Sequence, residues 1–251
     1  MTAARWFVCG MLFALTVLVA TEARAQDSSE KVKVLIVTGF DVKSHKWRDT
    51  TPFTRVVLEE TGRFDVRISE DIGIFESSSL NHYDVVVLNY GYWSAPDPSD
   101  EAKAGLLNFV KQGKGLVSLH FSCSSFQDWD EYRELLGRVW VKKVGGHGPR
   151  GKFEVNIKAK DHPLTKGVAD FETDDELYAK LSGSAEIEVL ASAYSDWSGK
   201  EEPILFLKNY GKGRVVHNVL GHDMRARQSS SYQTLLRRGV EFAATGKVTI
   251  D

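Results

Sequence analysis

Three runs of aliphatic residues constrain the fold of this chain more than any other feature. They cover residues 32–40, 83–88 and 115–120. Because these runs are rich in β-branched residues, they predict strands that are covered on both faces. Helices are predicted between them, over 51–62 with Pro52 in the first turn and over 99–112. This repeated order of strand and helix predicts an α/β fold with a mainly parallel sheet, right-handed crossovers and helices on both faces.

The rest of the chain is less regular and predicts shorter elements. The expected elements are strands over 64–68, 151–157, 186–193, 203–208 and 214–220, and a final helix over 229–244. Residues 151–157 alternate between polar and apolar side chains, which indicates an antiparallel or edge strand. No internal repeat, low-complexity tract or Pro/Gly-rich linker interrupts residues 26–251, so we expect one domain there.

The charges of the chain are balanced, with 32 Lys and Arg against 34 Asp and Glu. Without a basic field or a Lys/Arg run, nucleic acid is not an expected partner. A composition of 42% hydrophobic and 26% charged residues excludes a disordered, collagen-like or polytopic membrane protein. The phosphate-binding loop motif GxxxxGK[ST] does not occur, and no GxGxxG follows a predicted strand and opens a predicted helix, so no nucleotide cofactor is indicated.

Residues 1–25 have the organisation of a secretory signal peptide. Arg5 precedes an apolar stretch over 6–20, and residues 23–25, Ala-Arg-Ala, have the small-x-small form that signal peptidase accepts. The stretch of about 15 residues is shorter than the roughly 20 that a membrane-spanning helix needs. We therefore expect cleavage before Gln26, an exported protein that is periplasmic or secreted, and no membrane association afterwards.

Residues 26–251 contain a single cysteine, Cys123, which excludes an intramolecular disulfide in the mature chain. A catalytic nucleophile on a strand-to-helix elbow needs small residues on either side of it. The segment 119–123, Leu-His-Phe-Ser-Cys, lacks them. A single thiol is typical of buried packing, so we do not expect Cys123 to be a nucleophile.

Histidines follow predicted strands at the edge where parallel α/β sheets bind ligands. His45 follows the first strand, His120 ends the run 115–120, His222 follows the last strand, and His147 lies in a glycine-rich loop. Imidazole carries protons near neutral pH and binds divalent metals. His45, His120 and His222 are therefore the expected ligands of a metal such as zinc or manganese, although no linear metal motif occurs. The alternative for each histidine is a packed or capping role.

One acidic segment, residues 174–176, is expected to deliver a carboxylate to the same edge. Glu176 is the expected acid, and a solvated turn is the alternative. Together with His120, His147 and His222 it forms the set of candidate catalytic residues, because carboxylates and imidazoles are the usual proton carriers of enzymes.

Aromatic residues are frequent in the same loops. Flat rings stack on the apolar faces of sugars, so a small carbohydrate is the expected ligand. Asp223 is expected either to orient His222 or to cap the final helix. The substrate-binding candidates are His45, Trp47, Tyr92, Trp129 and Asp223.

Five segments of the sequence resemble one protein family. They are VLIVTGFDVKSHKWRDTTP (34–52), KQGKGLVSLHFSCSSF (111–126), GGHGPRGKFEVNI (145–157), DHPLTKGVADFETDDELY (161–178) and GKGRVVHNVLGHD (211–223). In their order and spacing they resemble the ThuA-like proteins of trehalose utilisation over nearly all of residues 26–251. The resemblance implies a flavodoxin-like fold similar to that of class I glutamine amidotransferases, and a role in sugar catabolism close to 3-keto-sugar pathways.

The resemblance also implies the residues of the pocket. They are His45, His120, His147, Glu176 and His222. Because His120 stands where the amidotransferases have their elbow cysteine, glutamine hydrolysis is not implied. Residues 122–124, Ser-Cys-Ser, differ from the Ala-rich stretch that the family would have there.

The leading functional hypothesis is an enzyme that acts on a keto-glycoside or related oxidised disaccharide. A ketone at carbon 3 of a sugar acidifies the hydrogen at carbon 2, so His120 or Glu176 would remove this proton while His222 protonates the departing glycosidic oxygen. Elimination or isomerisation would follow, with the negative charge stabilised by a metal ion or a protonated His147. The rival hypotheses are a non-catalytic carbohydrate-binding domain that uses the aromatic loops, and a metal-dependent hydrolase of ordinary glycosides or esters.

Overall fold

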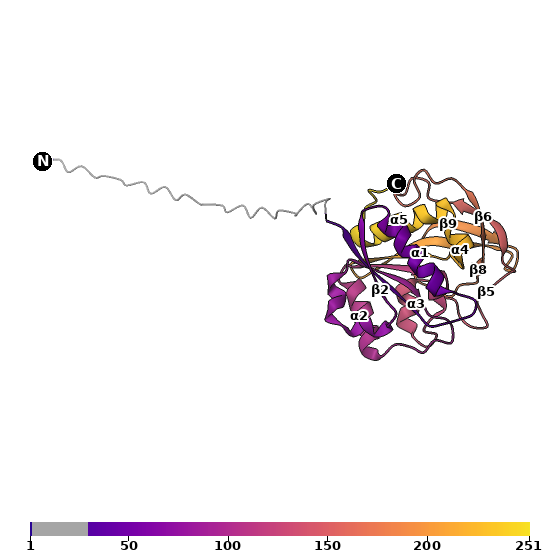
Figure 1. Ribbon diagram of the computed structural model, residues 1–251. Coiled ribbons are helices and arrows are strands. Elements are labelled where there is room, and N and C mark those ends of the chain that lie inside the picture. Colours follow the sequence, from indigo (N-terminus) through magenta and orange to yellow (C-terminus); the bar gives the residue numbers. More distant parts are fainter. Residues whose placement is uncertain (2–29) are drawn as a thin grey trace. The chain divides into compact units, whose positions relative to one another are not determined.

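The computed structural model describes Met1 and residues 30–251 (Figure 1). Residues 31–251 form one compact unit. The expected signal peptide, residues 1–25, lies outside the described residues apart from Met1.

A nine-stranded mixed sheet in the order β2-β1-β3-β4-β11-β10-β9-β6-β7 forms the centre of this unit. The five parallel strands are β1 (Val32–Gly39), β2 (Phe64–Ser69), β3 (Val85–Tyr90), β4 (Gly115–Leu119) and β11 (Gly213–Asn218). The four antiparallel strands are β10 (Lys200–Tyr210), β9 (Glu188–Ser195), β6 (Gly151–Ile157) and β7 (Phe171–Asp175). A separate small sheet pairs β5 (Gly146–His147) with β8 (Tyr178–Ala179).

Helices cover both faces of the sheet. The α-helices are α1 (Trp47–Glu59), α2 (Asp100–Lys111), α3 (Asp130–Leu136), α4 (Met224–Arg227) and α5 (Ser230–Thr245). The 3-10 helices are η1 (Ile72–Glu76), η2 (Ser78–His82) and η3 (His120–Ser124). Buried residues of α1 and α5 share one core cluster, whereas those of α2 and α3 share the other, which agrees with their positions on opposite sides of the sheet in Figure 1. The predicted α/β fold with helices on both faces is therefore confirmed.

The two cores explain the unbroken apolar runs. Ile36 of β1 belongs to the core under α1 and α5, while its neighbour Leu35 belongs to the core under α2 and α3. Successive side chains of a strand point to opposite faces, and here both faces are buried. Most positions of the central strands are therefore apolar, with buried polar exceptions such as Asn89 and Ser118.

Several elements begin or end at other residues than expected. The first helix begins at Trp47 rather than near Thr51, so Pro52 lies inside it and one N–H is missing from the helical hydrogen bonds. The strand predicted over 83–88 runs from Val85 to Tyr90. The helix predicted over 99–112 is confirmed, with the Ser99 hydroxyl accepting the backbone N–H of Ala102.

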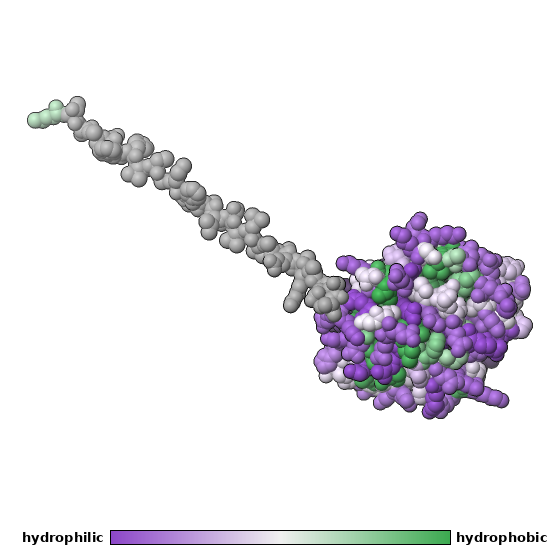
Figure 2. Space-filling view, turned by 45° about the horizontal axis from the view of Figure 1, so that its top comes forward, coloured by the Kyte–Doolittle hydropathy of each residue, from purple (hydrophilic) through white to green (hydrophobic). Residues whose placement is uncertain are grey.

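Among residues 30–251, no helix is both long enough and apolar enough to cross a membrane. On the face shown in Figure 2, hydrophobic residues lie in separate areas among hydrophilic ones.

Candidate functional site

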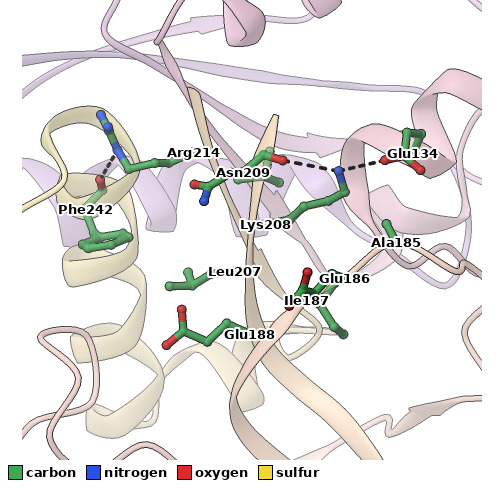
Figure 3. Close-up of a pocket in the computed structure, with 11 residues that line it drawn as sticks. Glu134, Ala185, Glu186, Ile187, Glu188, Leu207, Lys208, Asn209, Arg214 and Phe242 are labelled. Atoms are coloured by element: carbon green, nitrogen blue, oxygen red, sulfur yellow. Dashed lines mark hydrogen bonds and ion pairs between the residues drawn. The ribbon is translucent and has the colours of Figure 1, made fainter. Parts of the chain in front are cut away.

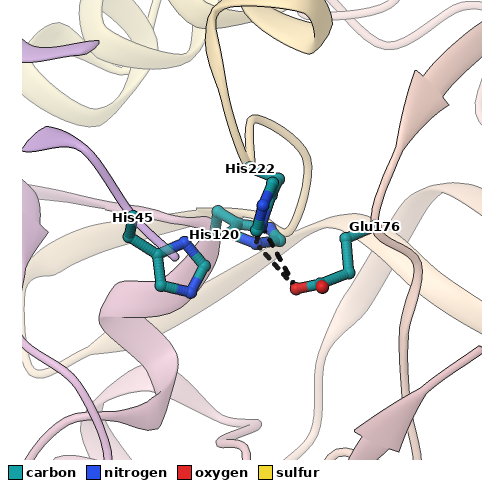
Figure 4. A group of neighbouring side chains, drawn as sticks. All are labelled: His45, His120, Glu176 and His222. Carbon is teal, nitrogen blue, oxygen red and sulfur yellow. Dashed lines mark hydrogen bonds and ion pairs between the residues drawn. The ribbon is translucent and has the colours of Figure 1, made fainter. Parts of the chain in front are cut away.

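Four side chains from four separate loops meet at one edge of the sheet (Figure 4). His45 lies in the loop after β1, His120 directly follows β4, Glu176 directly follows β7, and His222 lies in the loop after β11. Each offers one nitrogen or oxygen atom, and these four atoms lie within 4.8 Å of one another. The structure thus brings together the three histidines that sequence analysis placed at strand ends and the acid expected beside them.

The closest approaches join three of these residues. His222 Nδ1 lies 3.3 Å from His120 Nε2 and 3.3 Å from Glu176 Oε2, and His120 Nε2 lies 3.6 Å from the same oxygen. His120 is fully buried, and the side chains of Glu176 and His222 are 12% and 13% exposed. The group is therefore shielded from bulk water but remains open on one side.

The backbone fixes the direction of His120. Its φ angle of 38° lies in the left-handed region, where a non-glycine residue is strained. Its Nδ1 lies 2.7 Å from the carbonyl oxygen of Val219, which can only accept, so Nδ1 carries the proton and Nε2 presents its lone pair to the cluster. The segment 119–123 lacks the small residues of a strand-to-helix elbow, so no sharp turn was predicted here. The chain nevertheless makes a strained turn at the end of β4.

His45 is held by aromatic neighbours. Its ring stacks on Phe121 with centroids 4.5 Å apart, and its Nε2 lies 3.4 Å from the hydroxyl of Tyr178. Burial, followed by the charges of His120 and His222, lowers the pKa of His45 to about 2, so the ring is neutral at physiological pH. Its buried Nδ1 has no hydrogen-bond partner among the described residues.

Glu176 is ionised in this environment. Burial raises the pKa of its carboxyl group, but hydrogen bonds and charges from His120 and His222 outweigh burial and hold the pKa well below its usual value. A carboxylate therefore faces the imidazole nitrogens.

His147, the fourth expected catalytic residue, lies on β5 beside Glu176. Its Nδ1 is 2.7 Å from the Gly148 carbonyl oxygen and 3.3 Å from Glu176 Oε1, and its side chain is 41% exposed. Because both partners are acceptors, Nδ1 carries the proton of the neutral ring, and Nε2 is left as the basic atom. This histidine is the accessible member of the group.

Tyr178 and Phe121 are parts of the site that sequence analysis missed. Tyr178 is 5% exposed, and its ring stacks on His120 with centroids 4.2 Å apart. Burial, with a contribution from Glu176, raises the pKa of Tyr178 well above its usual value, so its hydroxyl stays protonated. The position of Tyr178 two residues after Glu176 was the one available signal.

A hollow of about 460 Å³ adjoins His45. It is lined by residues of the segment 41–49, including Trp47, whose indole Nε1 donates to Asp41 Oδ1 over 2.8 Å. Tyr92, with its ring centroid 6.1 Å from that of His45, lines a neighbouring hollow of about 670 Å³. These volumes lie in the range of small-molecule pockets.

Two of the expected substrate-binding residues have other roles in the structure. Trp129 is only 4% exposed and packs between Phe126 and Tyr132 in the core, so it offers no ring face to a sugar. Asp223 caps the short helix α4 rather than the final helix, accepting the backbone N–H of Arg225 over 2.9 Å. The structure therefore contradicts a stacking role for Trp129.

A hollow of about 820 Å³ lies away from this cluster (Figure 3). It is formed where Leu207–Asn209 of β10 meet the start of β11, at the amino-terminal ends of the parallel strands. Lys208 Nζ lies 3.0 Å from Glu134 Oε1, and its charge is thereby compensated. No histidine lines this hollow.

The donor set of the cluster fits a divalent metal ion. Three imidazole nitrogens and one carboxylate oxygen are ligands that zinc and manganese accept in proteins. His120 has the arrangement typical of metal-bound histidine, in which the remote ring N–H donates to a backbone carbonyl. The three atoms that lie 3.3 to 3.6 Å apart are all able to offer lone pairs to one cation.

A family model described as ThuA, trehalose utilisation, matches residues 33–243. The chain belongs to the ThuA family. A putative ThuA-like protein from Parabacteroides merdae is 30% identical, with 88% of this chain and 92% of that chain covered and a TM-score of 0.78. A putative ThuA-like protein from Bacteroides uniformis is 18% identical, with 86% and 94% covered and a TM-score of 0.69. No curated protein matches this ThuA chain.

The expectation that this ThuA protein is exported needs correction. A structural neighbour from Salmonella typhimurium, 17% identical over 85% of this chain and 100% of its own with a TM-score of 0.61, is described as a cytoplasmic protein. A second neighbour from the same organism has the same description. These descriptions contradict the prediction of a periplasmic or secreted protein, which we withdraw.

Proposed function

We propose that this ThuA protein is an enzyme of sugar metabolism that removes a proton next to the keto group of an oxidised, trehalose-like sugar, with the help of a divalent metal ion. The family is one of trehalose utilisation. The observation that carries the proposal is the convergence of His45, His120, Glu176 and His222 at one point.

The geometry favours a division of roles that differs from the sequence-based hypothesis. His120, Glu176 and His222 were expected to move protons, yet His120 Nε2, His222 Nδ1 and Glu176 Oε2, all potential metal ligands, lie only 3.3 to 3.6 Å from one another. Such atoms suit a metal ligand role, which His45 completes. When bound, the metal would supply positive charge that stabilises the oxygens of an enediolate.

His147 is the proton carrier in this proposal. The Gly148 carbonyl oxygen and Glu176 Oε1 accept from its Nδ1–H and so orient the ring. Glu176 thus has the role of the acid that orients the base in a nucleophile–base–acid arrangement. His147 Nε2 takes the proton from the carbon beside the keto group, and the electron pair of that C–H bond forms the carbon–carbon double bond of the enediolate. If His147 returns this proton to the carbon of the former keto group, the sugar isomerises; if His147 gives it to the glycosidic oxygen as the carbon–oxygen bond breaks, elimination results.

The surroundings of the site support a carbohydrate substrate. The hollow beside His45 has a volume of about 460 Å³, and it is lined by charged and polar side chains together with Trp47. A ligand with many hydroxyl groups finds hydrogen-bond partners on such a wall. The burial of Trp129 removes support from the rival carbohydrate-binding domain, which relied on exposed aromatic loops.

Hydrogen exchange at the substrate carbon tests the proposal. The protein, loaded with Mn²⁺ or Zn²⁺, is incubated in D₂O with 3-keto-trehalose, and loss of the signal of the hydrogen at carbon 2 is followed by NMR. We expect exchange with wild type, a fall of about 10²- to 10⁴-fold with His147→Ala, and no exchange with trehalose itself.

His82→Ala is the matched control, because this histidine is exposed and lies at the end of η2, away from the cluster. It is expected to exchange like wild type. Wild-type protein that exchanges no hydrogen in the presence of either metal would refute the proposal.

A further inference from the structure

A buried carboxylate, Asp175, lies next to the proposed site and has no role in the proposed mechanism. Asp175 is 1% exposed and directly precedes Glu176. Its Oδ2 accepts the backbone N–H of Gly221 over 2.7 Å, and its Oδ1 accepts those of His222 over 3.0 Å and Glu176 over 2.8 Å. One side chain thus holds the backbones of two members of the cluster.

A second buried charge holds the same turn from the other side. Arg227 is fully buried, and its Nε donates to the Gly221 carbonyl oxygen over 2.9 Å. Its two other nitrogens donate to Thr54 Oγ1 over 2.9 Å and to Asn89 Oδ1 over 2.7 Å. The peptide group between Gly221 and His222 therefore has its carbonyl fixed by Arg227 and its N–H fixed by Asp175.

The turn itself permits little adjustment. Gly221 has a φ of +105°, which other residues rarely adopt, and a Cβ at this position would lie 2.8 Å from the hydroxyl of Tyr232. The orientation of the His222 side chain follows from this backbone, because the peptide group before it is fixed on both sides.

We infer that Asp175 and Arg227 are positioning residues, a peptide clamp that holds His222 Nδ1 at 3.3 Å from Glu176 Oε2 and so keeps the proposed metal site ready to bind. Neither residue contacts the substrate or the metal in this scheme. The test by metal affinity rests on the proposed function, whereas the test by the metal-free signals of His222 does not. Residues that orient ligands in this way typically contribute 10- to 100-fold to metal affinity.

Asp175→Asn is the decisive variant. Its single oxygen can replace Oδ1, but its amide NH₂ group then faces the Gly221 N–H, so two donors meet where one carboxylate oxygen accepts now. The turn has to move although the side chain keeps its shape. Asp174→Asn is the matched control, because it removes the same charge one residue earlier from a side chain that is 39% exposed and paired with Arg150 and Arg225.

The experiment measures Mn²⁺ affinity by calorimetry and the ring resonances of His222 by NMR at one pH in the absence of metal. We expect Asp175→Asn to bind Mn²⁺ at least tenfold more weakly and to shift the His222 ring signals, while Asp174→Asn stays within twofold and leaves those signals in place. Mn²⁺ affinity of Asp175→Asn within twofold of wild type would overturn the inference.

Two further outcomes remain informative. If wild type binds no Mn²⁺, the proposed function fails, and the inference is then decided by the His222 signals measured without metal. A shift of these signals in Asp175→Asn and not in Asp174→Asn supports the clamp. Unchanged signals overturn it. If Asp175→Asn does not fold, Arg227→Lys replaces it, because lysine lacks the planar fork that reaches three acceptors. It is expected to weaken Mn²⁺ binding and shift the same signals, and wild-type behaviour of this variant would overturn the inference.

Discussion

The buried carboxylates at the two ends of the parallel strands have different kinds of partners. At the carboxyl-terminal ends, His120 Nε2, His222 Nδ1 and Glu176 Oε2, all potential metal ligands, lie within 3.6 Å of one another. At the amino-terminal ends, the buried carboxylate of Glu241 on α5 accepts from Arg63 Nε over 2.9 Å and from the backbone N–H of Thr249 over 2.7 Å. One end gathers potential metal ligands around a common point, and the other surrounds a carboxylate with hydrogen-bond donors.

The difference shows how a structural charge can be told from a functional one. Glu241 is surrounded by donors, so its pKa, which burial alone would raise, is lowered by hydrogen bonds from Thr249 and Arg63. Glu176 has two histidines as its main partners, and these are also the groups expected to bind a cation. A carboxylate whose oxygens all accept from nearby donors stabilises the fold. Potential metal ligands that converge at an accessible edge of the sheet instead indicate a ligand-binding site.

The largest effect is expected for removing the carboxylate from the carboxyl-terminal end. Glu176→Gln replaces a charged ligand by a neutral amide, and we expect Mn²⁺ or Zn²⁺ affinity to fall by at least 100-fold, about 2.7 kcal/mol. Calorimetric titration measures this change. Glu241→Gln serves as the control at the other end and should keep the affinity of wild type; equal losses in both variants would contradict the distinction between the two ends.

The next effect is expected at the amino-terminal end, and it concerns stability. Glu241→Gln should lower the free energy of unfolding by about 2 kcal/mol at pH 7, because hydrogen bonds to a charged acceptor are lost. The folded-state pKa of Glu241 lies below its ordinary 4.5, so its contribution is complete above pH 4.5 and disappears as the pH falls through the folded-state value. Urea unfolding at several pH values measures it.

An exposed ion pair provides the comparison for that stability effect. Glu59, 38% exposed and paired with Arg55 one helical turn away, should lose less than about 0.5 kcal/mol on substitution by Gln. A gap between wild type and Glu241→Gln that stays constant down to pH 3 would show that the carboxylate charge of Glu241 is not what stabilises the fold.

An effect that is absent near pH 7 and grows at lower pH is expected from a histidine in the middle of the sheet. His217 of β11 is fully buried, and burial lowers its pKa from 6.5 to about 3. Between these values the unfolded chain binds a proton that the folded chain does not, so stability falls as the pH drops from 6.5 towards 3, by about 1.4 kcal/mol per pH unit at most. His217→Gln should flatten this dependence in urea unfolding measured from pH 7 to pH 4, and an unchanged slope would refute the prediction.

The smallest effect on sugar binding is expected for Trp129. Trp129→Phe should lower stability by about 1 kcal/mol through lost core packing and change sugar affinity by less than twofold. Tyr92→Ala, close to His45, is the contrasting variant and should weaken sugar binding more. Saturation-transfer NMR with trehalose measures both, and a larger loss in Trp129→Phe would restore the stacking role.

The parallel half of the fold could be predicted from the sequence because burial on both faces leaves a clear signature. The strand β1 begins and ends where its apolar run does. Strand β7, Phe171–Asp175, could not be predicted, since four of its five residues are polar and its pairing with β6 determines its conformation. The small strands β5 and β8 are too short to give a periodic signal.

Site residues that follow the predictable parallel strands could be predicted, whereas the residue that follows an unpredicted antiparallel strand could not be placed from a local pattern. His45, His120 and His222 follow parallel strands, whose carboxyl ends share one edge of a sheet. Glu176 follows an antiparallel strand at the far end of the sheet, so its arrival beside His222 depends on tertiary structure that no local pattern shows. The burial of Trp129 depends on the packing of α3, which was not foreseen.

The four members of the cluster are distributed from position 45 to position 222 of the chain. During synthesis on a ribosome, the early residues leave the exit tunnel long before the late ones, so no intermediate length can assemble the group. A nascent or prematurely terminated polypeptide that ends before β11 would lack the strand that joins the parallel half of the sheet to the antiparallel half, and it would have no capacity for the proposed chemistry. The proposed activity would thus appear only after the segment that carries His222 has been synthesised and has folded.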